Sequence, residues 1–518
     1  MADLKDRLGV KINTICQFCS AGCAVELNVN ESVSCSVLSI SGVVNPDGFN
    51  CNRAIKGYQD IYNVERITQP LLKTSLGFRH ISFDEAFLLI EEHIHEEEPS
   101  ENAFFAGARL SNEELYLIQK IARAGVVTNN LNSFHYLGRG TGYLQNTKAN
   151  IPVNEILDTR VVYIIGDTLP IASPYTWHII QRAKKEENVK VVWITPTGNG
   201  AVSEIADEIV ETRSIYSFLK LLNRHLIVTE KADSFFTDEI CLDFQTYKTN
   251  LLSEDTGTHL KQADVSSLDI EQFVDHFLEA GKAIVVYTEE ELSGNTCREV
   301  HNLAMLTGKM GKYADGIVAI KEAVNSQGLI DMGIHPDYGQ GAVDINDSEF
   351  LLKAQETWGI EKLPEKSSSD FYTVLNNTPK NLFIFGEDPI GDATTHKAFI
   401  ETYIAKAEFK VVQDFYMTPT AQMADLVMPS TYLFESGGTY TNTQKIIQQV
   451  SQQLPSNIEM NGFEQLVAIA KRLGLPEMKS PIEAMFESIA MFPDGCTQKR
   501  PRFVYTENDD YFNLFSGD

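Results

Sequence analysis

The sequence predicts an α/β protein made of a small N-terminal cysteine module and two larger domains with parallel sheets. Three observations lead to this fold class. Four cysteines with metal-ligand spacing lie in the first 51 residues, buried-strand runs alternate with amphipathic stretches beyond residue 72, and one strand–glycine–helix pattern occurs twice. The length of 518 residues and a hydrophobic content of 43% allow two to four domains with large buried cores.

The N-terminal cysteines Cys16, Cys19, Cys23 and Cys51 have the spacing C-x2-C-x3-C, with the fourth after 27 intervening residues. Three thiolates on one tight loop and a distant fourth suit a cubane iron–sulfur cluster, in which each iron takes one soft sulfur ligand. A structural zinc site is the alternative, since four cysteines also satisfy tetrahedral zinc. The remaining cysteines are interpreted as buried small hydrophobic residues: Cys35, Cys241, Cys297 and Cys496.

The next elements have recognisable boundaries. The strand-like stretches 24–29 and 37–40 are expected to form a hairpin that carries the cysteine loop, and residues 66–72 form a proline-marked connection. Helical spacing follows over 84–95 and 112–124, and the second of these helices has an N-cap serine followed three residues later by a glutamate. The clear strand candidates are 161–165, 189–194, 283–287, 381–385 and 409–412.

Two regions form an internal repeat. The strand run 161–166 ends in Gly166 and the run 381–386 ends in Gly386, and 24 residues after each glycine the same Lys-Val-Val triplet begins. A glycine between a strand end and a helix start is a natural position for a phosphate, which suggests two Rossmann-like domains facing one phosphate-bearing ligand. The alternative is a pair of generic βαβ units whose turns favour glycine for packing. The candidate residues of the two turns are Gly166, Asp167, Gly386 and Glu387.

Charge and hydropathy exclude several classes of function. The net charge of −28 argues against nucleic-acid binding, because phosphate backbones require a basic face. No window approaches the roughly 20 apolar residues of a membrane span, so direct membrane insertion is not expected. The N-terminal residues have neither a signal-peptide core nor a twin-arginine pair, so the expected location is the cytoplasm.

Four further stretches have distinctive sequences: R-I-T-Q-P-L-L at 66–72, S-N-E-E-L through T-N-N at 111–130, N-S-Q-G-L-I-D-M-G at 325–333, and T-P-T-A through E-S-G-G-T-Y-T-N at 418–442. With the cysteine spacing and the repeat, they resemble the molybdopterin oxidoreductase superfamily. That group includes formate dehydrogenases, nitrate reductases and the large iron–sulfur subunit of complex I-type NADH dehydrogenases, to which the chain is closest in character. The resemblance runs from about residue 10 to about residue 475.

The resemblance implies cofactors and site residues. It implies a [4Fe–4S] cluster on the four cysteines, and it allows molybdopterin guanine dinucleotide as a second cofactor. Arg53, two places after the fourth cysteine, matches the basic residue that relays electrons between pterin and cluster in the family; the alternative is a surface arginine. The vestigial pterin- or nucleotide-binding residues that it implies are Gly166, Asp167, Gly386, Glu387, Gly437, Gly438, Thr439 and Asn442.

Three departures from the family pattern concern the pterin cofactor. The position of the family's metal ligand falls on Gly138, which has no coordinating side chain, and the following histidine position falls on Arg139; the nearby Ser133 and His135 are interpreted as structural. The family's fourth, cap domain of roughly 100–150 residues is not expected in the remaining tail. Residues 195–197 read T-P-T where catalytic relatives commonly have D-P-R.

We therefore expect an iron–sulfur electron-transfer and scaffold subunit of a multisubunit redox complex of the NADH dehydrogenase, formate dehydrogenase or hydrogenase type. Its partners would be flavin-, NAD-binding or iron–sulfur subunits. The alternatives are a short formate dehydrogenase-like enzyme that still binds a pterin, and a non-redox scaffold with zinc or no metal. The expected domains are 1–62 for the cluster module, 63–150 with 331–475 for one Rossmann-like domain, 151–330 for the other, and 476–518 for the tail.

Overall fold

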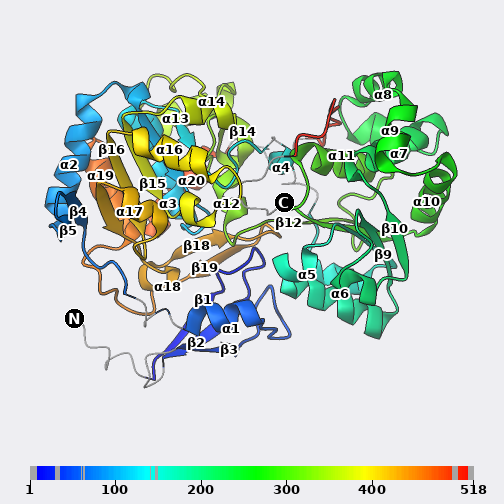
Figure 1. Ribbon diagram of the computed structural model, residues 1–518, viewed down its shortest axis with the longest axis horizontal. Helices are drawn as coiled ribbons and strands as arrows, with labels where there is room; N and C mark the ends of the chain where they lie inside the picture. Colours follow the sequence, from blue (N-terminus) through cyan, green and yellow to red (C-terminus); the bar gives the residue numbers. More distant parts are fainter. Residues whose placement is uncertain are drawn as a thin grey trace.

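The computed structural model describes residues 9–29, 35–59, 61, 65–139, 142–145, 150–492 and 500–511. Three parts are visible in Figure 1: a small module that contains the N-terminal cysteines, a large lobe around a seven-stranded sheet, and a small lobe around a five-stranded sheet. Both large sheets are mainly parallel and carry helices, so the mixed α/β class is confirmed. In the described parts of the chain no helix is both long and apolar enough to cross a membrane.

The cysteine module, residues 9–61, is a three-stranded antiparallel sheet with one helix. Its strands are β1 (Lys11–Ile15), β2 (Ala24–Val29) and β3 (Cys35–Ser39), and its helix is α1 (Asn52–Gln59). The expected hairpin is β2–β3, with Val29 opposite Cys35. Alternating side chains of β2 are buried, as the sequence pattern requires for a strand with one covered face.

The large lobe gathers strands from distant parts of the chain. Its sheet has the order β5-β4-β17-β16-β15-β6-β7, parallel except for the edge hairpin β4–β5. The strands are β4 (Leu71–Thr74), β5 (Gly77–His80), β6 (Asn102–Ala106), β7 (Leu131–Asn132), β15 (Asn381–Phe385), β16 (Phe409–Asp414) and β17 (Leu426–Pro429). Strand β6 pairs with β15, so the chain leaves this sheet after β7, builds the small lobe and returns.

The helices of the large lobe cover both faces of this sheet (Figure 1). They are α2 (Phe83–Glu96), α3 (Asn112–Lys120), α12 (Ser326–Asp331), α13 (Ser348–Trp358), α14 (Phe371–Asn376), α15 (Pro389–Asp392), α16 (Lys397–Lys406), α17 (Pro419–Met423), α18 (Leu433–Ser436), α19 (Gly462–Arg472) and α20 (Pro481–Met491). Two short hairpins accompany them: β13 (Tyr338–Gly339) with β14 (Val343–Asp344), and β18 (Gly438–Thr441) with β19 (Ile447–Val450).

The expected helix 112–124 is correct at its start and differs at its end. Ser111 and Glu114 form a reciprocal capping box at the N-terminus of α3. After Lys120 the backbone widens into a π-helix over Ile121–Val126 and ends at Val127 with a left-handed conformation. The widened turn places the buried Arg123 guanidinium where it donates to the His335 carbonyl at 2.7 Å. Tertiary packing therefore decides the end of this helix.

The small lobe is a fully parallel sheet with the order β10-β9-β8-β11-β12. Its strands are β8 (Val161–Ile165), β9 (Lys190–Thr195), β10 (Glu208–Glu211), β11 (Ala283–Thr288) and β12 (Gly316–Ile320). The helices of this part of the chain are α4 (Gly142–Gln145), α5 (Leu169–Ala172), α6 (Pro174–Glu187), α7 (Ile215–Val228), α8 (Phe244–Ser253), α9 (Thr256–Ala263), α10 (Ser267–Glu279) and α11 (Gly294–Leu306).

The two lobes correspond strand for strand over five positions, β17-β16-β15-β6-β7 against β10-β9-β8-β11-β12. The glycine turns also correspond. The Gly166 amide donates to the Ile194 carbonyl at 2.9 Å, and the Gly386 amide donates to the Gln413 carbonyl at 3.1 Å. Both glycines have a positive φ, of +92° and +64°, which favours glycine at these strand ends.

The C-terminal segment crosses from one lobe to the other. Helix α20 packs on α3, where Glu487 accepts a hydrogen bond from Tyr116 at 2.6 Å. Residues 500–511 then lie against the small lobe, and Leu242 exchanges backbone hydrogen bonds with Pro501 and Phe503. The expected tail of 476–518 is therefore partly helical; Cys496 lies outside the described residues.

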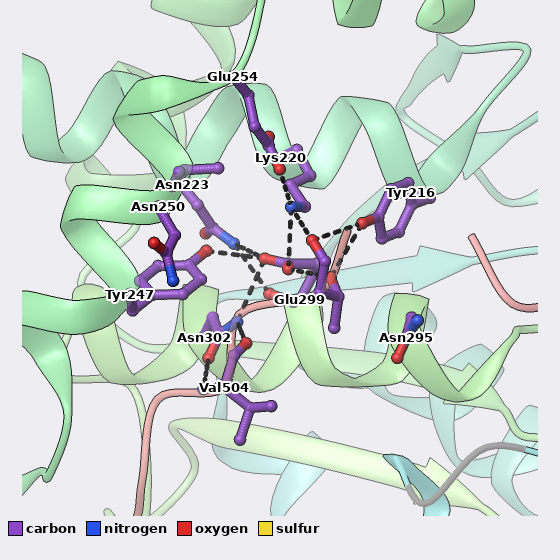
Figure 2. A network of polar contacts seen from close by, with 12 residues as sticks. Tyr216, Lys220, Asn223, Tyr247, Asn250, Glu254, Asn295, Glu299, Asn302 and Val504 are labelled. Atoms are coloured by element: carbon purple, nitrogen blue, oxygen red, sulfur yellow. Dashed lines mark hydrogen bonds and ion pairs between the residues drawn. The ribbon is translucent and has the colours of Figure 1, made fainter. Parts of the chain in front are cut away.

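A buried polar network fixes this segment to the small lobe (Figure 2). The carboxylate of Glu299 on α11 accepts hydrogen bonds from Tyr247 and Thr506, both at 2.7 Å, and from Asn223 at 2.9 Å. The Lys220 ammonium donates to Glu254 at 2.6 Å and also to the carbonyl of Thr506. Lys220 and Glu299 are fully buried, so each charge depends on the partners in this network.

We expect Lys220→Met to lower the free energy of unfolding by about 3–5 kcal/mol, because it leaves buried carboxylates without their cation. The matched control is Lys231→Met, since the Lys231–Asp275 pair is solvent-exposed and worth about 0–1 kcal/mol. Chemical denaturation of both variants measures the difference. Equal stability of the two variants would contradict the role of this network.

Candidate functional site

The cysteine loop connects β1 to β2. Cys16 follows β1, Cys23 precedes β2, and the Cys16 amide donates to the Cys23 carbonyl at 2.8 Å, which closes the loop. Cys16, Cys19 and Cys23 are buried, and the half-buried Cys51 directly precedes α1. The loop and the start of α1 therefore lie at the same end of the module.

The thiols influence one another electrostatically. Burial raises the pKa of Cys16, Cys19 and Cys23, and the neighbouring cysteines, Cys51 among them, raise it further. The pKa of Cys35 rises to about 11 through burial alone. Cys35 lies opposite Val29, at the end of β2 that is distant from Cys23, so it stands apart from the loop.

The donor set fits a cubane cluster in kind and number. Among the residues that the structure describes, no group of three or more His, Cys, Asp or Glu side chains is placed to hold a single metal ion. A cubane makes a different demand, because each thiolate binds its own iron. Backbone amides lower the pKa of all three thiols, from Phe18 for Cys16, from Ala21 and Gly22 for Cys19, and from its own residue for Cys23. Amides directed at sulfur favour the thiolate form that a metal requires.

Two side chains and one backbone amide of the β18–β19 hairpin donate to carbonyl groups of the cysteine loop. Asn442 donates to the Ala21 carbonyl at 3.1 Å, Gln448 donates to the Gly22 carbonyl at 2.8 Å, and the Thr443 amide donates to the Ser20 carbonyl at 2.9 Å. Gly22 has φ +66°, and a Cβ there would approach the Gln448 side-chain oxygen to 2.4 Å. Both the positive φ of Gly22 and its closeness to Gln448 therefore favour a glycine at this position of the loop.

Arg53 connects the cysteine module to the small lobe. It lies on α1, and its Nη1 donates to the carbonyls of Ile171 at 3.0 Å and Ala172 at 3.3 Å on α5. Its positive charge lowers the pKa of Cys16 and Cys19, against the larger effect of burial. Arg53 is thus an exposed residue that joins α1 to α5, and its relay role stays a prediction.

The turn after β8 is occupied by a carboxylate of the protein. Glu291 accepts hydrogen bonds from the Asp167 amide at 2.6 and 2.8 Å, from the Thr168 amide at 2.9 Å and from the Thr168 hydroxyl at 2.8 Å. The Asp167 carboxylate itself accepts from the Thr195 hydroxyl at 2.6 Å and the Thr197 hydroxyl at 2.9 Å. The T-P-T sequence at 195–197 therefore binds an acidic side chain of the same lobe.

The turn after β15 is also closed by protein groups. Glu387 accepts hydrogen bonds from the Ser133 hydroxyl at 2.5 Å and the Phe134 amide at 3.1 Å, and burial raises its pKa to about 7. Arg109 Nε donates to the Gly386 carbonyl at 2.9 Å. A Cβ on Gly107 would approach that carbonyl oxygen to 2.2 Å, so the β6 and β15 turns pack directly together.

The position expected for a metal ligand carries an ion-pair network. Gly138 has φ +75°, and the buried Arg139 beside it pairs with Glu322 at 3.2 Å and donates to the Glu289 carbonyl. Its guanidinium lies over the Tyr143 ring, with its carbon 4.2 Å from the centroid. Gly140 lies outside the described residues. Gly138 has no side chain that could coordinate a metal, and the Arg139 cation beside it is held in this ion pair.

Ser133 and His135 have structural partners in this region. His135 Nε2 is 2.8 Å from the Ser326 hydroxyl, and burial, with Arg139 and Lys321 nearby, keeps the pKa of His135 well below its usual range. Ser133 is bound to Glu387. The same network contains a fully buried ion pair between Lys321 and Glu289 at 2.8 Å.

The candidate residues of 437–442 connect the β18–β19 hairpin to α3 and to the cysteine loop. Gly437 and Gly438 have φ of +75° and +139° at the start of β18. The Thr439 amide and hydroxyl both donate to Glu113 on α3 at 2.9 Å, and burial raises the pKa of Glu113 to about 7. Asn442 serves the cysteine loop, as described above.

Sequence reasoning missed two residues that act with these candidates. Glu291 lies 124 positions from the turn that it occupies, in a loop without a recognisable motif. Glu435 binds both Nη atoms of Arg66, at 2.9 and 3.0 Å. Arg66 lies in the distinctive stretch 66–72 and Glu435 lies in the stretch 418–442. A search for opposite charges in these two stretches would have suggested this ion pair.

Comparisons with known proteins identify the family of this chain. The family model for molybdopterin oxidoreductases matches residues 66–472. The F420-dependent formate dehydrogenase 1 subunit alpha of Methanococcus maripaludis is 26% identical over 501 residues, which cover 92% of this chain and 73% of that relative. A protein of Staphylococcus aureus (strain USA300), named "Putative formate dehydrogenase", is 24% identical; the match covers 95% of this chain and 52% of that protein, so the chain spans about half of its length.

The fold matches a solved structure as well. Acetylene hydratase from Pelobacter acetylenicus superposes with a TM-score of 0.70 at 16% sequence identity, over 96% of this chain and 74% of that one. The likeness concerns the fold alone. Because the family model covers most of the chain, this protein belongs to the molybdopterin oxidoreductase family and is related to formate dehydrogenase alpha subunits.

Proposed function

We propose that this chain is an iron–sulfur electron-transfer and scaffold subunit of a multisubunit redox complex. The observation that carries the proposal is a contrast between two sites. Cys16, Cys19 and Cys23 are buried in one loop and Cys51 raises the pKa of each, while the position expected for the family's metal ligand is Gly138, next to an arginine in an ion pair. The chain thus keeps a donor set for a cluster and offers no protein donor at the catalytic metal position.

The cluster would be a [4Fe–4S] centre on Cys16, Cys19, Cys23 and Cys51. When bound, such a centre accepts and releases single electrons. The chain's own contribution is to hold the loop through the β18–β19 hairpin and to direct amides and the Arg53 charge toward the thiols. Zinc, or no metal, at these cysteines would instead support a non-redox scaffold.

A second candidate is a short formate dehydrogenase-like enzyme that binds molybdopterin guanine dinucleotide. The observation that favours it is the match to formate dehydrogenase alpha subunits over more than nine-tenths of the chain. In that case hydroxide, sulfide or a partner residue would have to complete the metal, because Gly138 supplies no ligand. The contacts of Arg139 and Glu291 favour the electron-transfer function over this one.

The partners would be flavin-, NAD-binding or iron–sulfur subunits of an NADH dehydrogenase-, formate dehydrogenase- or hydrogenase-type complex in the cytoplasm. A relay centre needs a donor and an acceptor, so at least one partner must approach the cysteine module. The module exposes Leu38, Val43 and Ile55, with 45%, 77% and 44% of their surface accessible. Apolar side chains exposed this close to the cysteines suit a docking surface for a redox subunit.

We expect anaerobically purified protein to contain about four iron and four sulfide per chain. Cys51→Ser should lose most of the iron, and so should Cys19→Ser, because each removes one of four thiolate ligands. The matched control is Cys35→Ser, in the same module, which should keep its iron. Iron and zinc analysis measures this result. Iron loss in the control, or zinc in place of iron, would contradict the ligand assignment.

We expect Arg53→Met to lower the reduction potential of the cluster by on the order of 50 mV, because a nearby positive charge stabilises the reduced, more negative form. Arg53→Lys should keep most of the potential, since it keeps the charge while it loses the guanidinium geometry. Redox titration followed by electron paramagnetic resonance measures both variants. An unchanged potential in Arg53→Met with full iron content would show that Arg53 only joins α1 to α5.

We expect the chain, purified without partners, to oxidise no formate and to reduce no nitrate, and to contain no stoichiometric molybdenum or tungsten. The physical reason is the missing side-chain ligand at Gly138. The control is a formate dehydrogenase with an intact ligand, produced in the same host. Stoichiometric molybdenum with turnover would favour the second candidate function.

A further inference from the structure

The turn after β8 lies where the sheet order reverses. From β8 the chain continues to β9 and β10 on one side, while β11 and β12 lie on the other. The carboxyl ends of strands at such a point are where open parallel sheets bind ligands, and free backbone amides there attract anions. In this chain the amides belong to Asp167 and Thr168, and the strand across the switch point is β11.

These amides already have an anion. The loop after β11 brings Glu291 back over the β8 turn, and its carboxylate takes both amides and the Thr168 hydroxyl at 2.6–2.9 Å. The contact is close, because a Cβ added to Gly166 would lie 2.3 Å from a Glu291 carboxylate oxygen. A phosphate would need the same donors and the same space, and it would meet a like charge.

The other groups at this end of the sheet do not favour a second anion. The Asp167 carboxylate points to Thr195 and Thr197, which adds negative charge beside the turn. Arg53 is bound to the carbonyls of Ile171 and Ala172. A diphosphate therefore has neither free amides nor a dedicated cation among these groups.

We propose that Glu291 is a built-in anion that occupies the Gly166 turn and excludes the diphosphate of a pterin dinucleotide from the small lobe. The inference goes beyond the proposed function, because an electron-transfer subunit is compatible with either a bound or an absent dinucleotide. The Glu291 side chain alone would keep the diphosphate out of the Gly166 turn. Loss of that side chain should open the turn to phosphate while the fold remains.

The test uses the full chain, produced with its partners in a host that makes molybdopterin guanine dinucleotide. Wild-type protein should release less than 0.1 guanine nucleotide per chain on denaturation, and calorimetric titration with GDP should show no saturable binding at 1 mM. The nucleotide threshold corresponds to about a tenth of one site per chain. The GDP concentration is about a thousand times a micromolar dissociation constant. Glu291→Ala should bind GDP at least tenfold more tightly than wild type, and Glu291→Gln should show a smaller gain.

The matched control is Glu211→Ala. Glu211 is the last residue of β10 in the same sheet, and its carboxylate approaches another glycine turn, at Gly198. It should behave as wild type. One guanine nucleotide per wild-type chain, or no gain in either Glu291 variant with native circular dichroism, would overturn the proposal. Iron content and cluster potential are read from the same samples, so failure of this inference is distinguishable from failure of the proposed function.

Discussion

The segment 439–443 contacts the large lobe, the cysteine module and the small lobe, and the arrangement of these three parts depends on it. Thr439 hydrogen-bonds to the start of α3 in the large lobe, and Asn442 holds the Ala21 carbonyl of the cysteine loop. The Thr443 hydroxyl donates to the Ala319 carbonyl on β12 of the small lobe at 2.7 Å. Most of these groups are buried, so they have no water to replace a lost partner. One short segment therefore fixes the cysteine module relative to both sheets.

Charged side chains of the protein bind the turns at the carboxyl ends of both parallel sheets. Glu291 and Glu387 take amides and hydroxyls at the two switch points, and Arg139 pairs with Glu322 beside the expected metal position. Buried ion pairs cost desolvation, which their mutual attraction offsets only when geometry and additional hydrogen bonds are good. Here each charge has several partners. The Glu291 and Glu387 carboxylates are thus bound within the protein, whereas the buried Nε of Arg139 has no hydrogen-bond partner among the described residues.

The cysteine module depends on that scaffold at two places. The β18–β19 hairpin fixes the backbone of the loop, and Arg53 joins α1 to the carbonyls of α5 in the small lobe. Both contacts lie outside the region around Gly138 and Arg139. A rigid position is what a relay centre needs, because electron transfer requires a fixed distance to its donor and acceptor. Under the proposed function, the α/β body would supply this fixed position.

The sequence determined the features that depend on local pattern. The strands 161–165 and 381–385 agree with β8 and β15 because short runs rich in β-branched and aromatic residues and followed by a glycine favour a buried strand, and the Ser111–Glu114 box is a local hydrogen-bond pattern. The cysteine spacing likewise predicts a ligand set, and that set stays a prediction. Tertiary structure alone decided that β6 pairs with β15, 279 positions away, and that Glu291 fills the turn at Gly166. Such contacts join residues with no shared local pattern, so only the folded chain brings them together.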